Sequence, residues 1–123
     1  MTDSAREGGV KTRREVLGDA HVDRSDANRT PLTEEFLDLL TRYAWGEIWT
    51  RPGLDRRTRS CITVAMLVAL GHHEELRLHL RGALNNGVTA EEIKEVLLQS
   101  AIYAGVPAAN TAFRIAGEVL TEA

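Results

Sequence analysis

A histidine at the edge of an apolar helical stripe is the residue best placed for proton chemistry. Residues 73–86 have helical spacing, with Leu76 and Leu80 on one face. His79 falls at the border of that face, and Glu75 precedes it by one turn. A carboxylate one turn away orients a histidine and raises its pKa, which suits a general acid near neutral pH. The alternative is a histidine that is merely satisfied by a backbone or carboxylate partner.

Both tryptophans of the chain occur in one short segment that also carries charged side chains. Trp45 and Trp49 are four residues apart, Glu47 lies between them, and Arg51 follows. Flat aromatic walls beside an arginine suit a planar anionic ligand, because a guanidinium binds carboxylates bidentately and indole excludes water. Aromatic anchors at a subunit interface would have the same composition, and the sequence leaves both interpretations open.

Two further residues are weaker candidates for a site. Arg59 belongs to an arginine-rich helix start, where it would bind an anion or simply contribute surface charge. His21 lies in a charged, aperiodic segment, where a solvated histidine is the alternative. The adjacent His72 and His73 would point about 100° apart on a helix, and no clean set of three ligands follows, so we predict no metal site.

The apolar periodicity predicts an all-α fold of about six helices to position these side chains. A capping box at Thr89 and Glu92 gives the clearest helix start. We expect a disordered tip at residues 1–9 and a single domain over residues 10–123, with an arm at 10–29 and a helical core at 30–123. Within the arm, a short helix should end at Gly18 and the rest should be loop. The helices expected in the core begin near residues 31, 55, 73, 90 and 107, and the first of them should break around Gly46.

Composition excludes several classes of function. The net charge of −3 argues against nucleic-acid binding, so an acidic substrate would need local arginines. The single cysteine, Cys61, has no partner for an internal disulfide, which fits a reducing compartment. No export signal or membrane span is visible, so we expect a cytoplasmic protein. Alanine-rich stripes and few aromatics favour a homo-oligomer over a monomeric bundle.

Longer motifs carry a resemblance to a known family. The segment from residue 54 to 98, with GHHEELRLH, ALNNG and TAEEIKE, resembles the core of the carboxymuconolactone decarboxylase family, which includes the alkylhydroperoxidase-type proteins. The peroxidase branch has CxxC before the histidine, where this chain has His72 and Glu75, so thiol peroxidase chemistry is not expected. The motifs RREVLGDAHVDR, RYAWGEIWTRPGLDRRTRS, HLRGALNNG and EIKEVLLQSAIYAGVPAANTAF resemble the decarboxylase branch.

The resemblance implies an alkylhydroperoxidase-like helical bundle, a ring-like hexamer and no cofactor. It also implies decarboxylation of 4-carboxymuconolactone to 3-oxoadipate enol-lactone, in the protocatechuate branch of the beta-ketoadipate pathway. For that reaction we expect His79 to donate the proton, with Glu75 or Glu47 orienting it. The remaining expected binding residues are Arg51, favoured over Arg59, the two tryptophans Trp45 and Trp49, and more weakly Tyr103 and His21. The alternatives are a related decarboxylase or lactone-processing enzyme with another acidic substrate, and a non-catalytic oligomeric binding protein.

Overall fold

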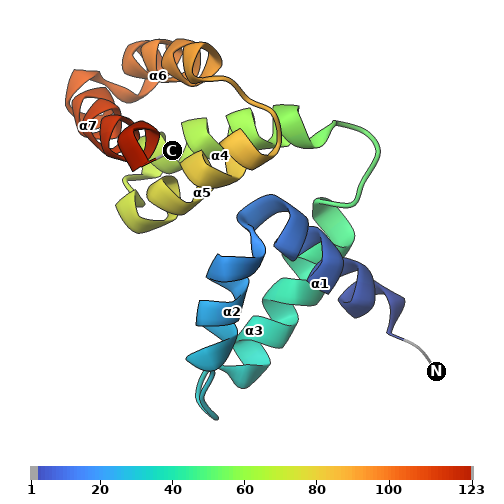
Figure 1. Cartoon of the computed structure of the whole chain (residues 1–123). Helices are drawn as coiled ribbons and strands as arrows, with labels where there is room; N and C mark the ends of the chain where they lie inside the picture. Colours follow the sequence, from blue (N-terminus) through green and yellow to red (C-terminus); the bar gives the residue numbers. More distant parts are fainter. Residues whose placement is uncertain (1–2, 123) are drawn as a thin grey trace. The chain divides into compact units, whose positions relative to one another are not determined.

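The computed structural model describes residues 3–122, and within them the chain is all-helical (Figure 1). Seven α-helices and one π-helix form there, so the all-α prediction is confirmed while the expected count of about six is too low. The chain divides into two compact units, residues 1–55 and 56–123, which are described separately below. The single domain expected over residues 10–123 stays a prediction.

The first unit begins with a helix where we expected disorder. α1 spans Ser4–Leu17, and its N-cap residue Asp3 accepts a hydrogen bond from the backbone nitrogen of Arg6 at 3.1 Å. The disordered tip at 1–9 is therefore wrong for residues 4–9, because a capping carboxylate starts the helix early. Residues 1–2 lie outside the described residues. The helix ends before Gly18, as expected, with a φ of 91° at this glycine.

The rest of the arm is helical as well, which corrects the expected loop. α2 spans Asp19–Ala27. Arg14 of α1 donates to Asp19 at 3.0 Å and to Asp23 at 2.9 Å, so one guanidinium ties the two helices together. Val22 is 2% exposed and supplies an apolar anchor. These contacts between helices have no helical period, so periodicity does not reveal them.

The helix that carries the tryptophans does not break at the glycine where we expected it to end. α3 spans Glu34–Leu40 and continues into the π-helix η1, Thr41–Ile48. The backbone nitrogen of Trp49 donates to the Ala44 carbonyl at 2.9 Å, a bond across five residues that is typical of a π-helix. The break expected around Gly46 is therefore wrong, because Gly46 lies inside η1 and the winding changes from α to π earlier, between Leu40 and Thr41.

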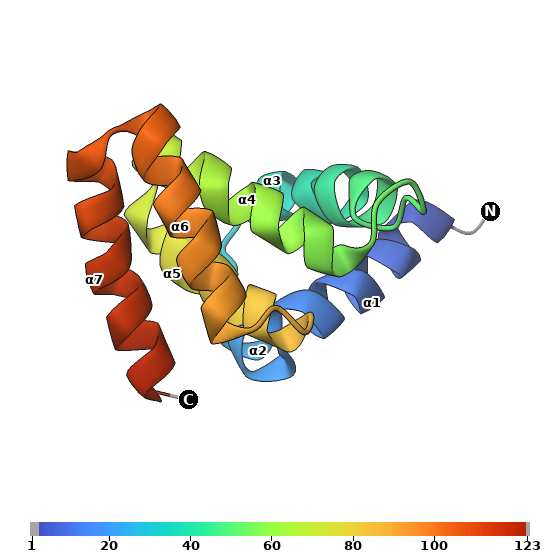
Figure 2. The ribbon, with the colours of Figure 1, turned by 90° about the horizontal axis from the view of Figure 1, so that it is seen from above.

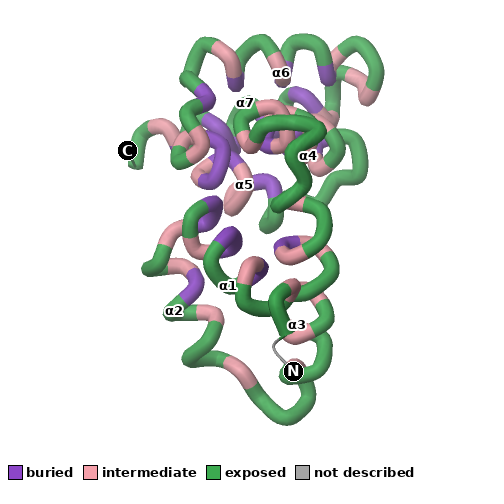
Figure 3. The backbone as a smooth tube through the Cα atoms, turned by 90° about the vertical axis from the view of Figure 1, so that its right-hand side faces the viewer, coloured by how far each residue is buried: buried purple, intermediate pink, exposed green. Residues whose placement is uncertain are grey.

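The second unit consists of four helices around one apolar core (Figure 2). They are α4 (Arg56–Leu70), α5 (His73–Asn85), α6 (Ala90–Ala104) and α7 (Val106–Glu122), close to the predicted limits. The capping box is confirmed, because Thr89 and Glu92 exchange side-chain hydrogen bonds with each other's backbone at 3.1 and 3.0 Å. Buried positions recur along α5 and α7 (Figure 3), and Leu76 and Leu80 are completely buried.

Candidate functional site

The two tryptophans form a stacked pair on η1 and the residue after it. Their ring centroids lie 5.2 Å apart with an interplanar angle of 30°. Trp45 is only 5% exposed and Trp49 is half-buried, so one indole is anchored inside the protein while the other is partly open. The pair thus offers a flat apolar surface of the kind that the sequence predicted for a planar ligand.

Charged side chains flank this pair on the same unit. Glu47 lies on η1 and is exposed. Arg51 is also exposed, and its backbone nitrogen donates to the Ile48 carbonyl at 3.1 Å, which places it on the turn that follows η1. The hydroxyl of Thr50 donates to the Gly46 carbonyl at 2.6 Å and tightens the same turn. A carboxylate and a guanidinium therefore lie within a few residues of the indoles.

His21 also lies on the first unit, on α2. It is half-buried, and therefore less solvated than a histidine in an aperiodic loop would be. The structure replaces the solvated loop with a regular helix, but a role for this side chain in chemistry stays a prediction.

On the second unit, His79 occupies the position that its spacing predicted. It is half-buried on α5, between the fully buried Leu76 and Leu80. Glu75 lies one turn earlier on the same helix and is exposed. The imidazole is thus held by a rigid helix at the boundary of the core, where a proton donor can meet a bound molecule.

A hydrogen bond links the end of α5, the helix that carries His79, to the N-terminal part of α4, the helix that carries Arg59. The Asn86 side-chain amide donates to the Ser60 hydroxyl at 2.8 Å, and Ser60 is 1% exposed. Arg59, next to this serine on α4, is half-buried. The contact fixes the N-terminal part of α4 against the end of α5.

Arg57, also at the start of α4, makes two structural contacts. Arg57 forms an ion pair with Glu92 and donates to the Gly87 carbonyl at 3.3 Å. It therefore fastens the start of α4 to the segment that connects α5 and α6.

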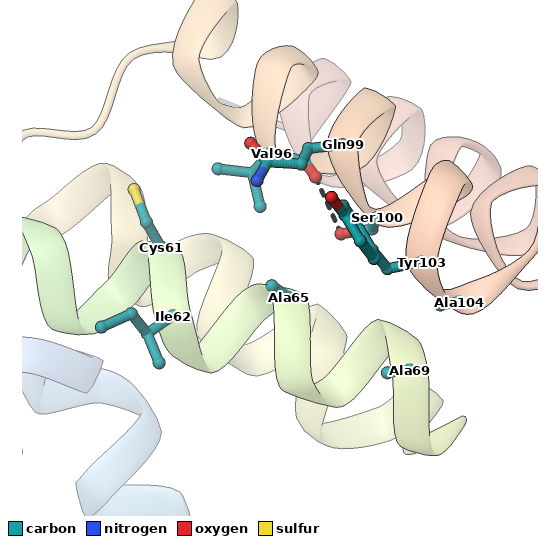
Figure 4. Close-up of a pocket in the computed structure, with 9 residues that line it drawn as sticks. All are labelled: Cys61, Ile62, Ala65, Ala69, Val96, Gln99, Ser100, Tyr103 and Ala104. Atoms are coloured by element: carbon teal, nitrogen blue, oxygen red, sulfur yellow. Dashed lines mark hydrogen bonds between the residues drawn. The ribbon is translucent and has the colours of Figure 1, made fainter.

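The second unit also has an apolar groove between α4 and α6, with a volume of about 380 Å³ (Figure 4). Sequence reasoning missed this groove, because residues from two separate helices form it. Of the predicted site residues, Tyr103 lines it, and no arginine or histidine belongs to its lining. The hydroxyl of Ser100 in its wall already donates to the Val96 carbonyl at 2.8 Å. The groove therefore suits apolar contact better than an anionic ligand.

The predicted site residues thus fall on both units. His21, Trp45, Glu47, Trp49 and Arg51 belong to the first, and Arg59, Glu75, His79 and Tyr103 to the second. In residues 3–122, no group of three or more histidine, cysteine or acidic side chains is placed to hold a metal ion. Within the same residues, no helix is both long and apolar enough to cross a membrane.

Comparison with known proteins gives one family and several relatives. The model of the Carboxymuconolactone decarboxylase family matches residues 34–118. A 4-carboxymuconolactone decarboxylase from Acinetobacter baylyi is 49% identical over 123 residues, which cover 99% of this chain and 92% of that protein. Nitrosuccinic acid decarboxylase npaB from Metarhizium robertsii is 41% identical over 93% of this chain and 80% of its own. An uncharacterized 15.0 kDa protein from Paracoccus denitrificans is 36% identical over 69% of this chain and 64% of its own.

Proposed function

The chain belongs to the carboxymuconolactone decarboxylase family, and from this premise we propose that it decarboxylates 4-carboxymuconolactone to 3-oxoadipate enol-lactone without a cofactor. The observation that carries the proposal is the 49% identity, over almost the whole of both chains, to a relative named for that substrate. Arginines and indoles in one short segment and a histidine at a core edge provide the side chains that such a reaction needs. We place the reaction in the protocatechuate branch of the beta-ketoadipate pathway.

The substrate supplies its own electron sink in this reaction. Breaking the bond to the ring carboxylate releases CO2, and the bonding electron pair moves through the ring alkene to the lactone carbonyl. The intermediate is a furanolate-like dienolate, and one proton delivered to the carbon next to the carbonyl gives the enol-lactone. The protein must therefore hold the spectator acetate, stabilise the developing oxyanion and deliver a proton to carbon.

In this proposal, His79 delivers the proton. Its half-burial on a rigid helix supports the role, because a proton donor must reach the ligand from a fixed position. Glu75, one turn away on α5, orients the imidazole, and Glu47 is the other candidate for that task. Glu75 is exposed, so solvent and salt screen its charge from the imidazole.

The indole pair forms the dry wall of the site. The stacked rings of Trp45 and Trp49 exclude water from the carboxylate that departs, and desolvation favours neutral CO2 over the charged group. Arg51, on the turn just after the pair, binds the acetate, with Arg59 as the second choice. Tyr103 and His21 are the weaker candidates for the oxyanion donor.

We further propose that the chain forms a homo-oligomer, as a ring-like hexamer. Large apolar side chains are exposed on the second unit, and on α4 they follow one helical face with spacing of four: Ile62, Met66 and Leu70 are 38%, 58% and 66% exposed. On α6, Ile102 and Tyr103 are 78% and 86% exposed. Contiguous apolar surface of this kind is typical of subunit interfaces. We also propose that the protein works in the cytoplasm, because its single cysteine, Cys61, fits a reducing compartment.

A second candidate function is decarboxylation of another acidic substrate. The observation that favours it is the 41% identity, over 93% of this chain, to a relative named nitrosuccinic acid decarboxylase. Nitrosuccinic acid shares two features with the lactone: a spectator carboxylate, and an acceptor group for the electron pair that CO2 leaves behind. Side-by-side turnover of the two compounds decides between these substrates. Binding of the lactone without any turnover would instead favour the third possibility, a non-catalytic oligomeric binding protein.

The catalytic assignment is tested with His79→Ala, and His72→Ala serves as the matched control. We expect His79→Ala to lower kcat by about 10²–10⁴-fold, which is the usual contribution of a positioned proton donor. His72 is the exposed N-cap residue of α5 and should tolerate replacement within about twofold, since its side chain makes no capping hydrogen bond. Near wild-type turnover in folded His79→Ala would remove the histidine from the mechanism.

A further inference from the structure

Two glycines mark the place where α1 crosses the π-helix within the first unit. A methyl group built on Gly9 of α1 would overlap the Thr41 carbonyl oxygen and lie 3.0 Å from the Gly46 backbone nitrogen. A methyl group on Gly46 of η1 would overlap the Ala5 carbonyl oxygen and lie 3.2 Å from the Thr41 oxygen. The two backbones therefore touch at this crossing, and neither position has room for a side chain.

The space requirement is specific to these glycines. A methyl group on the neighbouring Gly8 would have no atom of the described residues within 4 Å beyond its own helix. A second contact joins the same two helices at the N-terminus of α1, where Arg42 Nε of η1 donates to Oδ2 of the N-cap residue Asp3 at 2.7 Å. The crossing is therefore a built contact between α1 and η1.

The crossing lies immediately beside the aromatic pair. Gly46 follows Trp45 directly in the sequence. The π-helical hydrogen bond from the Trp49 backbone nitrogen to the Ala44 carbonyl spans the same turn. The winding of η1 sets the direction in which the side chains after it point. Because the crossing fixes the backbone on both sides of Gly46, it also fixes the two indoles relative to each other.

The position of α1 in the family comparison adds a second observation. The family match covers residues 34–118, so η1 lies inside the matched range and α1 lies outside it. A helix beyond the shared family segment thus holds the part of that segment that carries both tryptophans.

We propose that Gly9 and Gly46 are positioning residues, and that their crossing holds the π-helix so that Trp45 and Trp49 keep their stacked geometry. The part of this inference that concerns turnover rests on the proposed function, in which the indoles wall the site. The part that concerns geometry does not depend on the reaction.

The test compares Gly9→Ala and Gly46→Ala with the control Gly8→Ala in the full-length protein. Since the chain has only two tryptophans, stacked at 5.2 Å, their coupled transitions give an exciton couplet in circular dichroism that reports this pair alone. We expect Gly9→Ala and Gly46→Ala to lose most of the couplet, and Gly8→Ala to keep it. A couplet that is the same in all three variants would overturn the proposal.

Turnover of 4-carboxymuconolactone by the same variants separates the positioning of the indoles from their role in catalysis. We expect kcat to fall about 10²-fold in the crossing variants, the size of effect that a small misplacement near the chemistry produces. If the couplet is lost while kcat matches Gly8→Ala, the crossing positions the indoles but the wall has no role in catalysis. If the wild type itself shows no turnover, the proposed function fails and the couplet still decides the geometry.

Hydrogen exchange on the wild-type protein gives a measurement that does not need a folded variant. If the crossing joins α1 to η1, the Trp49 amide proton should exchange in step with the amides of α1, as parts of one cooperative unit. Rapid exchange at Trp49 while α1 stays protected would show that η1 opens by itself, and would overturn the proposal even if Gly9→Ala failed to fold.

Discussion

Replacing Leu80 by alanine tests how strongly the core holds the helix that carries the histidine. Leu80 is completely buried on α5, next to His79. Removal of its three outer carbon atoms at about 0.8 kcal/mol each costs about 2.4 kcal/mol in transfer free energy. The cavity that remains raises the loss to about 3–4 kcal/mol in the free energy of unfolding.

Urea denaturation followed by far-ultraviolet circular dichroism measures this loss at a fixed protein concentration. With a slope of about 2 kcal/mol per molar urea, the midpoint should fall by about 1.5–2 M for Leu80→Ala. The conservative control, Leu80→Met, keeps the volume and should lose less than about 1.5 kcal/mol. Equal losses for the two variants, or a loss below about 1 kcal/mol for alanine, would refute the assignment of this side chain to a tightly packed core.

Three further outcomes follow from the contacts on the two units. Ser60→Ala removes the acceptor of the 2.8 Å bond from Asn86 and should cost about 1–2 kcal/mol in thermal unfolding; an unchanged Tm would contradict this role. A hydrogen bond from Arg77 holds the Glu118 pKa below 4.5, so this pair stabilises the protein above about pH 4.5, and the stabilisation is lost as pH falls through the lowered pKa. Glu118→Gln should therefore flatten the acid limb of Tm against pH, and an unchanged limb would argue against the pair. Trp49→Phe should abolish the indole couplet and raise KM or lower kcat, and wild-type kinetics would remove this ring from the site.

The second unit follows from local signals in the sequence. The capping box at Thr89, the glycine after Leu70 and the apolar stripe through Leu76 each act within a few residues, so the chain itself displays them. The buried positions of α5 follow the predicted face for the same reason. Local chemistry and tertiary packing agree there, and the helix limits were predictable to within a residue or two.

The first unit depends on contacts that local patterns do not contain. The helix in the arm relies on Arg14 meeting two aspartates of α2, and the π-helix accompanies a backbone contact between Gly9 and Gly46. In a sequence, a glycine inside a helical pattern indicates a break, and only the neighbouring helix shows that it permits close approach. The resulting errors were a disordered tip, a loop and a helix end.

The positions of the candidate site residues were only partly predictable. The stacking of Trp45 and Trp49 and the edge position of His79 agree with their spacing along the chain. The groove between α4 and α6 was not predictable, since Cys61 and Val96 are distant in sequence and line the same groove only because the two helices pack together. The spacing of residues within one helix reveals which face is apolar, whereas a groove depends on how two helices pack against each other.

The proposed reaction is decarboxylation of a carboxylated lactone by the protein alone. The most direct measurement follows the absorbance of 4-carboxymuconolactone with purified protein in the presence of a chelator and without added nucleotide, together with the CO2 released. We predict that the substrate is consumed and that one CO2 and one enol-lactone form for each lactone lost. Loss of the lactone no faster than in buffer, with folded protein, would contradict the proposed decarboxylation.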